Sequence, residues 1–191
     1  MIRFEDVIIK IGDFQLVANV TVPKGFTSVI GQSGAGKSTF LSSLSGHRAL
    51  TSGKIFVDET RIDLLPSNKR PCSIIFQEFN LFPHLSIVQN LNLVCGNKFF
   101  VSESSREKIK KVLEKVDIVE LIDRLPSEMS GGQQSRAALA RVLLQRNPIL
   151  LLDEPFSALG PNQKSELIDL VDRLSKEQDI SVLLITHDPK D

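Results

Sequence analysis

Apolar positions along the chain change their period several times, and these changes predict its elements. Three short apolar segments open the chain, at residues 2–10, 14–22 and 26–30. Gly12 and a Pro-Lys-Gly run at 23–25 separate them, so this start predicts short strands that pair antiparallel. Residues 149–152 and 180–185 instead form apolar runs, and Ser181 is the one polar residue in them. Such runs are typical of strands buried on both faces, as in a parallel sheet.

Helical spacing replaces the strand patterns in the middle of the chain, between residues 77 and 145. Apolar side chains recur there three and four positions apart, at Ile109, Val112, Leu113 and Val116 and again at Leu121, Ile122 and Leu125. This period predicts amphipathic helices. Another helix is predicted between the last two strands, and shorter strands are predicted at 54–58 and 72–76.

The length of the chain limits it to one domain, because 191 residues are enough for one ordinary core and too few for two. Strands that alternate with helices indicate an α/β fold with a parallel sheet, here interrupted by a helical insertion. We predict a core at 1–78 and 146–191, which includes an antiparallel β subdomain, and an α-helical subdomain at 79–145.

Composition and charge argue against nucleic acid binding, secretion and membrane insertion. Lys plus Arg and Asp plus Glu number 23 each, so no net field attracts nucleic acid or an anionic membrane surface. The amino terminus lacks the apolar stretch of a signal peptide. Cys72 and Cys95 are therefore predicted to be reduced thiols in the cytosol. No apolar run approaches the ~20 residues of a membrane-spanning helix, so none is predicted.

Residues 31–38, GQSGAGKS, fit the pattern G-x-x-x-x-G-K-[ST] and lie between a predicted strand and a predicted helix. Glycines let backbone N–H groups turn toward phosphate oxygens, and the helix N-terminus adds the positive end of its dipole. Lys37 would reach the β- and γ-phosphates, and the Ser38 hydroxyl would bind Mg²⁺. A plain turn is the alternative, but the flanking strand and helix favour a P-loop NTPase core. The nucleotide-binding residues predicted here are Gly31, Ser33, Gly34, Ala35, Gly36, Lys37 and Ser38.

Two other stretches supply complementary chemistry. Asp153 and Glu154 follow a predicted strand, where one carboxylate can hold Mg²⁺ opposite Lys37 and the other can polarise a water. The segment from Ser130 to Gln133 is a capping box, S-x-x-Q, and its two glycines leave the helix N-terminus open to a phosphate. By themselves the carboxylates would fit a solvated turn, and the serine and glycines a flexible cap. Beside the phosphate loop, the binding interpretation is favoured.

Five motifs together resemble the ATP-binding subunits of ABC transporters. They are GQSGAGKST at 31–39, Gln77 in IFQEFNLFPH, MSGGQ at 129–133, ILLLDEPFSAL at 149–159 and His187 in ITHD. They follow that family's order and span nearly the whole chain. The resemblance implies a P-loop NTPase core of the ABC ATPase type, with ATP and Mg²⁺ as its ligands.

The resemblance also implies roles for single residues. Thr39 would assist at the α-phosphate, and Gln77 would touch Mg²⁺ or the attacking water. Glu154 resembles the catalytic base and His187 the sensor of the γ-phosphate. The implied catalytic residues are Glu154, His187, Gln77 and Lys37, and the implied metal ligands are Ser38, Gln77 and Asp153. Without the family, Gln77 would be an exposed polar residue and His187 a structural one.

Partners follow from the same resemblance. Two subunits would pair head to tail, so that one subunit closes over the nucleotide of the other through Ser130, Gly131, Gly132 and Gln133. A membrane permease, and through it a periplasmic solute-binding protein, would complete an importer, with this peripheral subunit at the cytoplasmic face of the inner membrane. Chromosomal ATPases with these motifs need long coiled coils, and the chain has no sustained heptads, so no nucleic acid partner is implied.

Apolar residues after Gln77 are predicted to face the permease, with a cap on the helical core as the alternative; they are Phe79, Leu81, Phe82 and Leu85. The middle segment is most similar to the subunits that drive thiamine import. Those of molybdate and ferric-iron importers are near relatives, and a weakly catalytic or regulatory module is a further alternative.

Three features depart from the family. Gly160 stands where the family usually has Asp, which predicts slower or less coupled hydrolysis. The chain has no Tyr or Trp to stack on adenine near Ile11, so Phe14 is the candidate substitute. The sequence stops at Asp191, four residues past His187, where family members normally continue, so an abbreviated subunit is expected.

Overall fold

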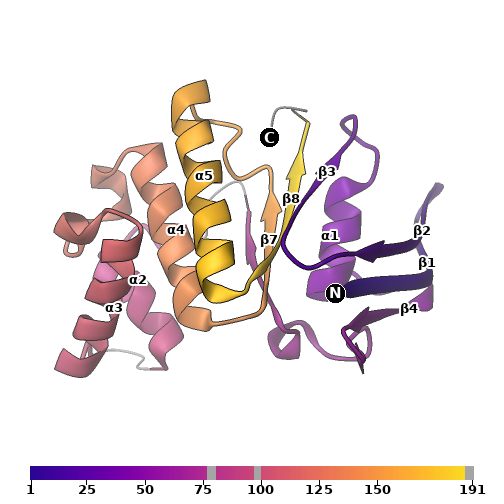
Figure 1. The fold of residues 1–191 in the computed structure, drawn as a ribbon, viewed down its shortest axis with the longest axis horizontal. Coiled ribbons are helices and arrows are strands. Elements are labelled where there is room, and N and C mark those ends of the chain that lie inside the picture. Colours follow the sequence, from indigo (N-terminus) through magenta and orange to yellow (C-terminus); the bar gives the residue numbers. More distant parts are fainter. Residues whose placement is uncertain (77–80, 97–99, 188–191) are drawn as a thin grey trace. The chain divides into compact units, whose positions relative to one another are not determined.

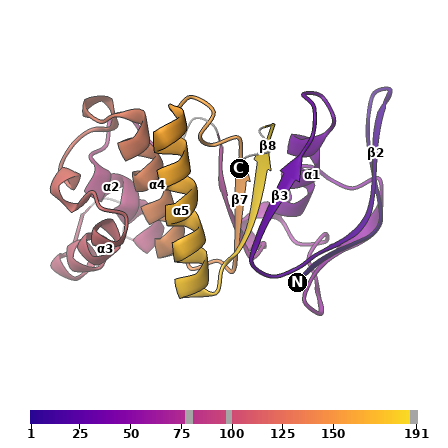
Figure 2. The same cartoon turned by 45° about the horizontal axis from the view of Figure 1, so that its top comes forward.

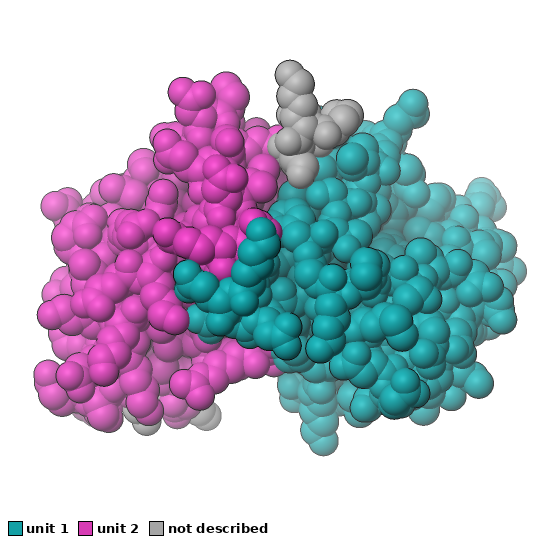
Figure 3. Space-filling view, viewed as in Figure 1, with its two compact units in different colours: residues 1–74, 148–153, 175–191 teal, residues 75–147, 154–174 magenta. Residues whose placement is uncertain are grey.

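The computed structural model of the protein describes residues 1–76, 81–96 and 100–187. The chain divides into two compact units, coloured separately in Figure 3. Unit 1 comprises residues 1–74, 148–153 and 175–191, and unit 2 comprises 75–147 and 154–174. The core and the helical subdomain predicted from the sequence, with their boundaries at 78, 79, 145 and 146, stay predictions.

An antiparallel sheet in unit 1 has the strand order β2-β1-β4-β5 (Figure 1). Its strands are β1 (Ile2–Ile11), β2 (Phe14–Val22), β4 (Ser52–Val57) and β5 (Thr60–Arg61). β1 pairs antiparallel with β2, as predicted. It also pairs antiparallel with β4, a pairing that the sequence did not predict, and the short β5 has no counterpart among the predicted strands. Phe4, Val7 and Ile9 are fully buried. A register shift between Phe4 and Val7 keeps these side chains on one face although they are three positions apart.

A second sheet has the order β3-β8-β7-β6. Its strands are β3 (Phe26–Ile30), β8 (Ser181–Thr186), β7 (Ile149–Asp153) and β6 (Cys72–Ile75). β8 runs parallel to β3 and β7 (Figure 2), and the apolar residues of β7 and β8 are buried, as predicted.

The prediction that β3 belongs to the antiparallel start is wrong. Pro23 has no N–H for a strand ladder, and Gly25 has a φ of 100°, so the chain turns away after β2. The carbonyl of Gly25 then accepts a hydrogen bond of 2.9 Å from the Val182 N–H. β3 is thereby led into the parallel sheet.

Helix α1 (Lys37–Ser45) buries its apolar face in the core of unit 1. Leu41 and Leu44 are fully buried, and the Phe40 ring stacks on Phe4 with ring centroids 4.4 Å apart. Each such side chain contributes about 1.5–3 kcal/mol of hydrophobic stabilisation. The helix that begins at the phosphate loop is therefore anchored by the core.

The guanidinium of Arg70 closes the other end of α1. Arg70 follows a 3₁₀ turn (Ser67–Lys69). Its guanidinium donates to four carbonyls, those of Ser43 (2.7 Å), Leu44 (3.1 Å), Asp63 (3.0 Å) and Leu65 (3.0 Å). Burial lowers the pKa of Arg70, and these carbonyls satisfy its buried N–H groups. Gly46 has a φ of 81°, and a Cβ there would lie 2.7 Å from the Arg70 Nε, so this position requires glycine.

Unit 2 consists mainly of helices. They are α2 (Ile87–Asn92), α3 (Glu103–Lys115), α4 (Gly131–Gln145) and most of α5 (Pro161–Gln178), with 3₁₀ turns at Leu93–Cys95, Val119–Leu121 and Pro126–Glu128. The apolar face predicted for α3 is confirmed, because Ile109 and Leu113 are fully buried.

The helix predicted over residues 121–125 is wrong. A 3₁₀ turn ends at Leu121, and Leu125 is extended, with a φ of −82° and a ψ of 152°. A residue that precedes proline is pushed out of the α region, and Pro126 follows Leu125. The proline therefore overrides the helical spacing.

Neither Cys72 nor Cys95 forms a disulfide, in agreement with the prediction of reduced thiols. Burial raises the pKa of the Cys72 thiol to about 11, so it stays protonated at neutral pH and is a poor nucleophile. In the part of the chain that the structure describes, no helix is both long enough and apolar enough to cross a membrane.

Candidate active site

The loop between β3 and α1 adopts a conformation that needs glycine. Gly34 and Gly36 have φ values of 79° and 91°, in the left-handed region. At Gly36 a Cβ would also lie only 2.7 Å from the Phe14 ring. Gly36 is the N-cap of α1, so the loop backbone meets the positive end of the helix dipole. These are the components of an anion-binding site.

The side chain of Lys37 folds back over this loop. Its Nζ donates to the carbonyls of Gly31 at 2.7 Å and Gln32 at 2.9 Å. The Ala35 N–H closes the same turn by donating to the Gln32 carbonyl at 3.2 Å. Phosphate oxygens can replace these neutral carbonyls, because their negative charge adds a direct attraction to the ammonium that donates the hydrogen bond. The ammonium of Lys37 thus lies against the backbone of the loop between β3 and α1.

Ser38 and Asp153 are brought together although they are far apart in sequence. The Ser38 Oγ, in the first turn of α1, donates to the Asp153 Oδ1 at the end of β7, at 3.1 Å. A hydroxyl and a carboxylate are oxygen ligands that suit Mg²⁺. No group of three or more His, Cys, Asp or Glu side chains that could hold a metal occurs within residues 1–76, 81–96 and 100–187. Mg²⁺ usually keeps several waters and binds through one or two protein groups together with substrate phosphates, so the two oxygen ligands Ser38 and Asp153 fit this ion.

The pairing register of β3, β8 and β7 places the phosphate loop and His187 at the edge of the parallel sheet where Asp153 lies. Ile30 pairs with Thr186, and Ile185 pairs with Asp153. The phosphate loop and the exposed His187 consequently follow directly at this edge, where the carboxyl ends of the strands lie (Figure 2). Ligands of α/β sheets bind outside these ends.

Glu154, which directly follows Asp153, has a left-handed backbone conformation. Its φ is 46°, and its side chain is half-buried. The left-handed region costs a residue with a Cβ about 1–2 kcal/mol. Five other described residues with a Cβ also have a positive φ, so this conformation by itself assigns no role to Glu154; they are Asp6, Asp58, Asp117, Arg146 and Asp179.

The capping box predicted at the start of α4 is confirmed. The Ser130 Oγ accepts from the Gln133 N–H at 3.3 Å, and the Gln133 Oε1 accepts from the Ser130 N–H at 2.9 Å. Gly131 and Gly132 are helical, so their dihedral angles do not require glycine. A Cβ at Gly131 would lie 3.0 Å from Leu159, whereas a Cβ at Gly132 would meet nothing within 4 Å. The helix start is thus open on the side of Gly132.

Known proteins resemble the chain over most of its length. A family model described as ABC transporter matches residues 17–157. The chain belongs to the ABC transporter family. It is similar to the thiamine import ATP-binding protein ThiQ of Ruegeria sp. (strain TM1040), with 42% identity over the whole chain and 83% of that protein, and to ThiQ of Aliivibrio fischeri, with 41% identity over the whole chain and 82% of that protein.

A solved structure is similar as well: the dimeric, post-hydrolysis state of an ATP-binding cassette bound to ADP and Pi. It has 27% identity and a TM-score of 0.82, and the match covers the whole chain and 89% of that structure. The predicted fold class, a P-loop NTPase core of the ABC type, is confirmed. As an ATPase of the ABC transporter family, the chain binds and hydrolyses ATP.

Two residues that the sequence singles out in this ABC transporter ATPase, Gln77 and Phe79, lie outside the described residues. Conversely, sequence reasoning missed Asn90, whose side chain is fully buried in α2. Its signal is a polar residue between the apolar positions Val88 and Leu91 of a helical face. A buried polar side chain needs hydrogen-bond partners, but the sequence does not say which ones.

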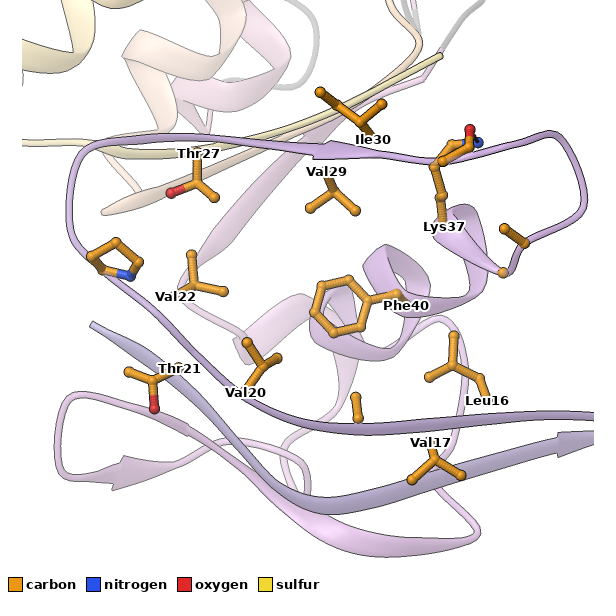
Figure 4. A pocket seen from close by; sticks show the side chains of 15 residues that line it. Leu16, Val17, Val20, Thr21, Val22, Thr27, Val29, Ile30, Lys37 and Phe40 are labelled. Atoms are coloured by element: carbon orange, nitrogen blue, oxygen red, sulfur yellow. Dashed lines mark hydrogen bonds between the residues drawn. The ribbon is translucent and has the colours of Figure 1, made fainter. Parts of the chain in front are cut away.

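An apolar groove of about 380 Å³ in unit 1 lies beside the phosphate loop of the ATPase. Val29 of β3 and Phe40 of α1 point into it, opposite Leu16 and Val20 of β2 (Figure 4). Its lining is mainly apolar but also includes Gly31, Gly36 and Lys37, so the groove adjoins the loop of residues 31–38.

Proposed function

We propose that this ATPase drives the import of thiamine through a bacterial membrane permease. The observation that carries the proposal is the identity of 42% and 41%, over the whole chain, to two thiamine import ATP-binding proteins. The alternatives are an importer of molybdate or ferric iron and a regulatory module. The solute itself would contact the permease and the periplasmic binding protein rather than this subunit.

The residues at the sheet edge fit ATP and Mg²⁺ as ligands. Lys37 would leave the carbonyls of Gly31 and Gln32 and bind the β- and γ-phosphates, while the loop N–H groups bind phosphate oxygens. Ser38 and Asp153 would hold Mg²⁺, together with Gln77. The ion, when bound, neutralises charge on the phosphates. The rest of the proposed binding set is Gly31, Ser33, Gly34, Ala35, Gly36 and Thr39.

Proton transfer and charge sensing fall to three other residues in this proposal. Glu154 would accept a proton from the attacking water, and its place directly after Asp153, the last residue of β7, supports that role. His187 would donate a hydrogen bond to the γ-phosphate from the end of β8. Gln77 would contact the same water or the metal.

A second copy of the chain would complete the site. The similar cassette with ADP and Pi is dimeric, and a head-to-tail pair would place the Ser130–Gln133 cap of one copy over the nucleotide of the other. The open space at Gly132 supports such an approach. The permease would hold both copies at the cytoplasmic face of the inner membrane.

The surface proposed to meet the permease lies just before α2. Phe82 is 42% exposed there, with Leu81 and Leu85 half-buried beside it in sequence. The Arg141 guanidinium lies over the Phe82 ring, 5.8 Å from its centroid. An exposed aromatic ring held by a cation suits a partner helix.

ATP turnover and solute uptake in vesicles with the thiamine permease and binding protein test this function. Glu154→Gln keeps the shape of the side chain but removes its basicity, so we expect turnover and thiamine uptake to fall at least 100-fold. Uptake of molybdate or ferric iron in place of thiamine, with their own permeases, would favour the alternative importers. A wild type with no more turnover than Glu154→Gln, even with permease, would favour the regulatory module.

A further inference from the structure

The amide of Asn90 holds the backbone of the loop that precedes its own helix. Asn90 is completely buried, and its Oδ1 accepts a hydrogen bond from the Phe82 N–H at 2.7 Å. Its Nδ2, which has two N–H donors to share, lies within hydrogen-bond distance of three carbonyls of the same loop, those of Phe82 (3.1 Å), Leu85 (2.8 Å) and Ser86 (3.1 Å). One side chain therefore joins four backbone groups of residues 82–86.

The backbone of this loop takes no part in a sheet, and its one helical bond is that of the Ser86 carbonyl, which accepts from the Asn90 N–H at 2.9 Å at the start of α2. Leu85 N–H donates to the Phe82 carbonyl at 3.2 Å, and Ser86 N–H donates to the Gln89 Oε1 at 2.9 Å. Buried backbone groups need partners, and here a side chain supplies most of them. The conformation of residues 82–86 thus depends on Asn90 more than on local propensity.

What the loop presents is the exposed Phe82 ring. The backbone N–H and carbonyl of Phe82 are both hydrogen-bonded to the side-chain amide of Asn90. This amide therefore fixes the Phe82 Cα, from which the ring projects. The ring itself contacts Arg141 and lies edge-on to His84, with centroids 6.1 Å apart. A ring held in place before binding loses less conformational entropy when a partner docks.

We propose that Asn90 is a positioning residue, which pre-forms the 82–86 loop so that Phe82 is ready to dock against the permease. This inference rests on the proposed function, because it needs the permease as the partner of that surface. Asn90 acts through Phe82 and has no part in nucleotide binding or hydrolysis. Its loss weakens docking and thereby the coupling of ATP hydrolysis to transport.

Two variants of Asn90 dissect these hydrogen bonds. Asn90→Asp has the same shape and still accepts from the Phe82 N–H, but its carboxylate cannot donate to the three carbonyls. Asn90→Ala removes all of these bonds. Asn92→Ala is the matched control, because Asn92 is equally buried in α2, at 3% exposure, and its Nδ2 donates to the Phe100 carbonyl, outside the loop, at 3.3 Å.

The first measurement is hydrogen exchange at the Phe82 amide in the isolated subunit, which needs no permease. We expect exchange at least tenfold faster in Asn90→Ala than in the wild type, and no change in Asn92→Ala. Unchanged exchange in Asn90→Ala would overturn the inference whatever the transported solute is.

The second measurement is ATP turnover as a function of permease concentration. We expect basal turnover of the Asn90 variants to stay within about twofold of the wild type. The permease concentration for half-maximal stimulation should rise about tenfold, a loss of about 1.4 kcal/mol of docking free energy, with near-normal stimulation at saturation. Asn92→Ala should behave like the wild type.

The outcomes separate the two proposals. Loss of basal turnover in both Asn90 variants would make Asn90 a structural residue only and would overturn the inference. Equal effects of Asn90→Ala and Asn92→Ala on stimulation would do the same. A wild type that the thiamine permease fails to stimulate contradicts the proposed function instead, and the exchange measurement then still tests whether Asn90 fixes the loop.

Discussion

The structural environment of Phe14 bears on its predicted role as the aromatic residue that stacks on adenine. It pairs with Ile11 at the tip of the β1–β2 hairpin, and both side chains are 37% exposed. The Phe14 ring, however, reaches the phosphate loop, because a Cβ at Gly36 would lie 2.7 Å from its Cζ. The chain has no Tyr or Trp, so we propose the exposed Phe14 ring as an aromatic surface for a base beside the loop.

We expect Phe14→Ala to weaken ATP binding about tenfold, because stacking of a base on an aromatic ring contributes roughly 1–3 kcal/mol. Calorimetric titration with ATP and with inorganic tripolyphosphate separates stacking from loop packing. Tripolyphosphate affinity should not change, since that ligand has no base. Ile11→Ala, at equal exposure, should leave both affinities unchanged. A parallel loss of tripolyphosphate affinity in Phe14→Ala would mean that the ring only supports the loop.

The start of helix α5 carries one of the departures from the family, a glycine where the family usually has Asp. Gly160 occupies its N-cap position, with its carbonyl accepting from the Lys164 N–H at 3.0 Å. Gly160 has no positive φ, and a Cβ there would meet nothing within 4 Å. Neither backbone nor packing therefore requires glycine, and the Asp that the family usually has would fit.

We expect Gly160→Asp to stabilise the protein by up to about 1 kcal/mol, because an aspartate caps the first N–H groups of α5 and interacts favourably with its dipole. Thermal unfolding measures this gain. ATP turnover with permease should also rise, since the resemblance links this carboxylate to communication between the two sites. Gly160→Asn, an uncharged cap, is the control: equal turnover in both variants would assign the effect to stability alone.

The whole molecule is proposed to act as a pair of chains around two nucleotides. We expect Glu154→Gln, which slows turnover, to form a stable dimer with Mg²⁺-ATP and to remain monomeric without it, as measured by light scattering after size exclusion. In this background Gly132→Asp should abolish the dimer, because the added carboxylate faces a phosphate and like charges at an interface cost several kcal/mol.

Gly132→Ala is the control for that substitution. The open space at Gly132 accepts a methyl group, and alanine favours the helix, so dimerisation should persist. A dimer that survives in Gly132→Asp would contradict the head-to-tail arrangement. No dimer in Glu154→Gln with Mg²⁺-ATP would contradict the pair itself.

Local patterns in the sequence were sufficient for the features whose physics is local. The loop at 31–38 needs Gly34 and Gly36 for its positive φ values, and the capping box from Ser130 to Gln133 closes within four residues. Both were therefore readable from residue types and spacing. The burial of β7 and β8 was readable too, because a strand covered on both faces has no polar alternation.

Tertiary structure decided what depends on residues far apart in the chain. Which sheet β3 joins, the 3.1 Å contact of Ser38 with Asp153 and the hydrogen bonds of the Asn90 amide follow from pairing register and burial. The sequence pattern shows that an apolar strand must be buried and that a buried polar residue must be hydrogen-bonded. Many neighbouring segments could meet either requirement. Only the packed chain selects one, because close packing and hydrogen-bond geometry exclude the others.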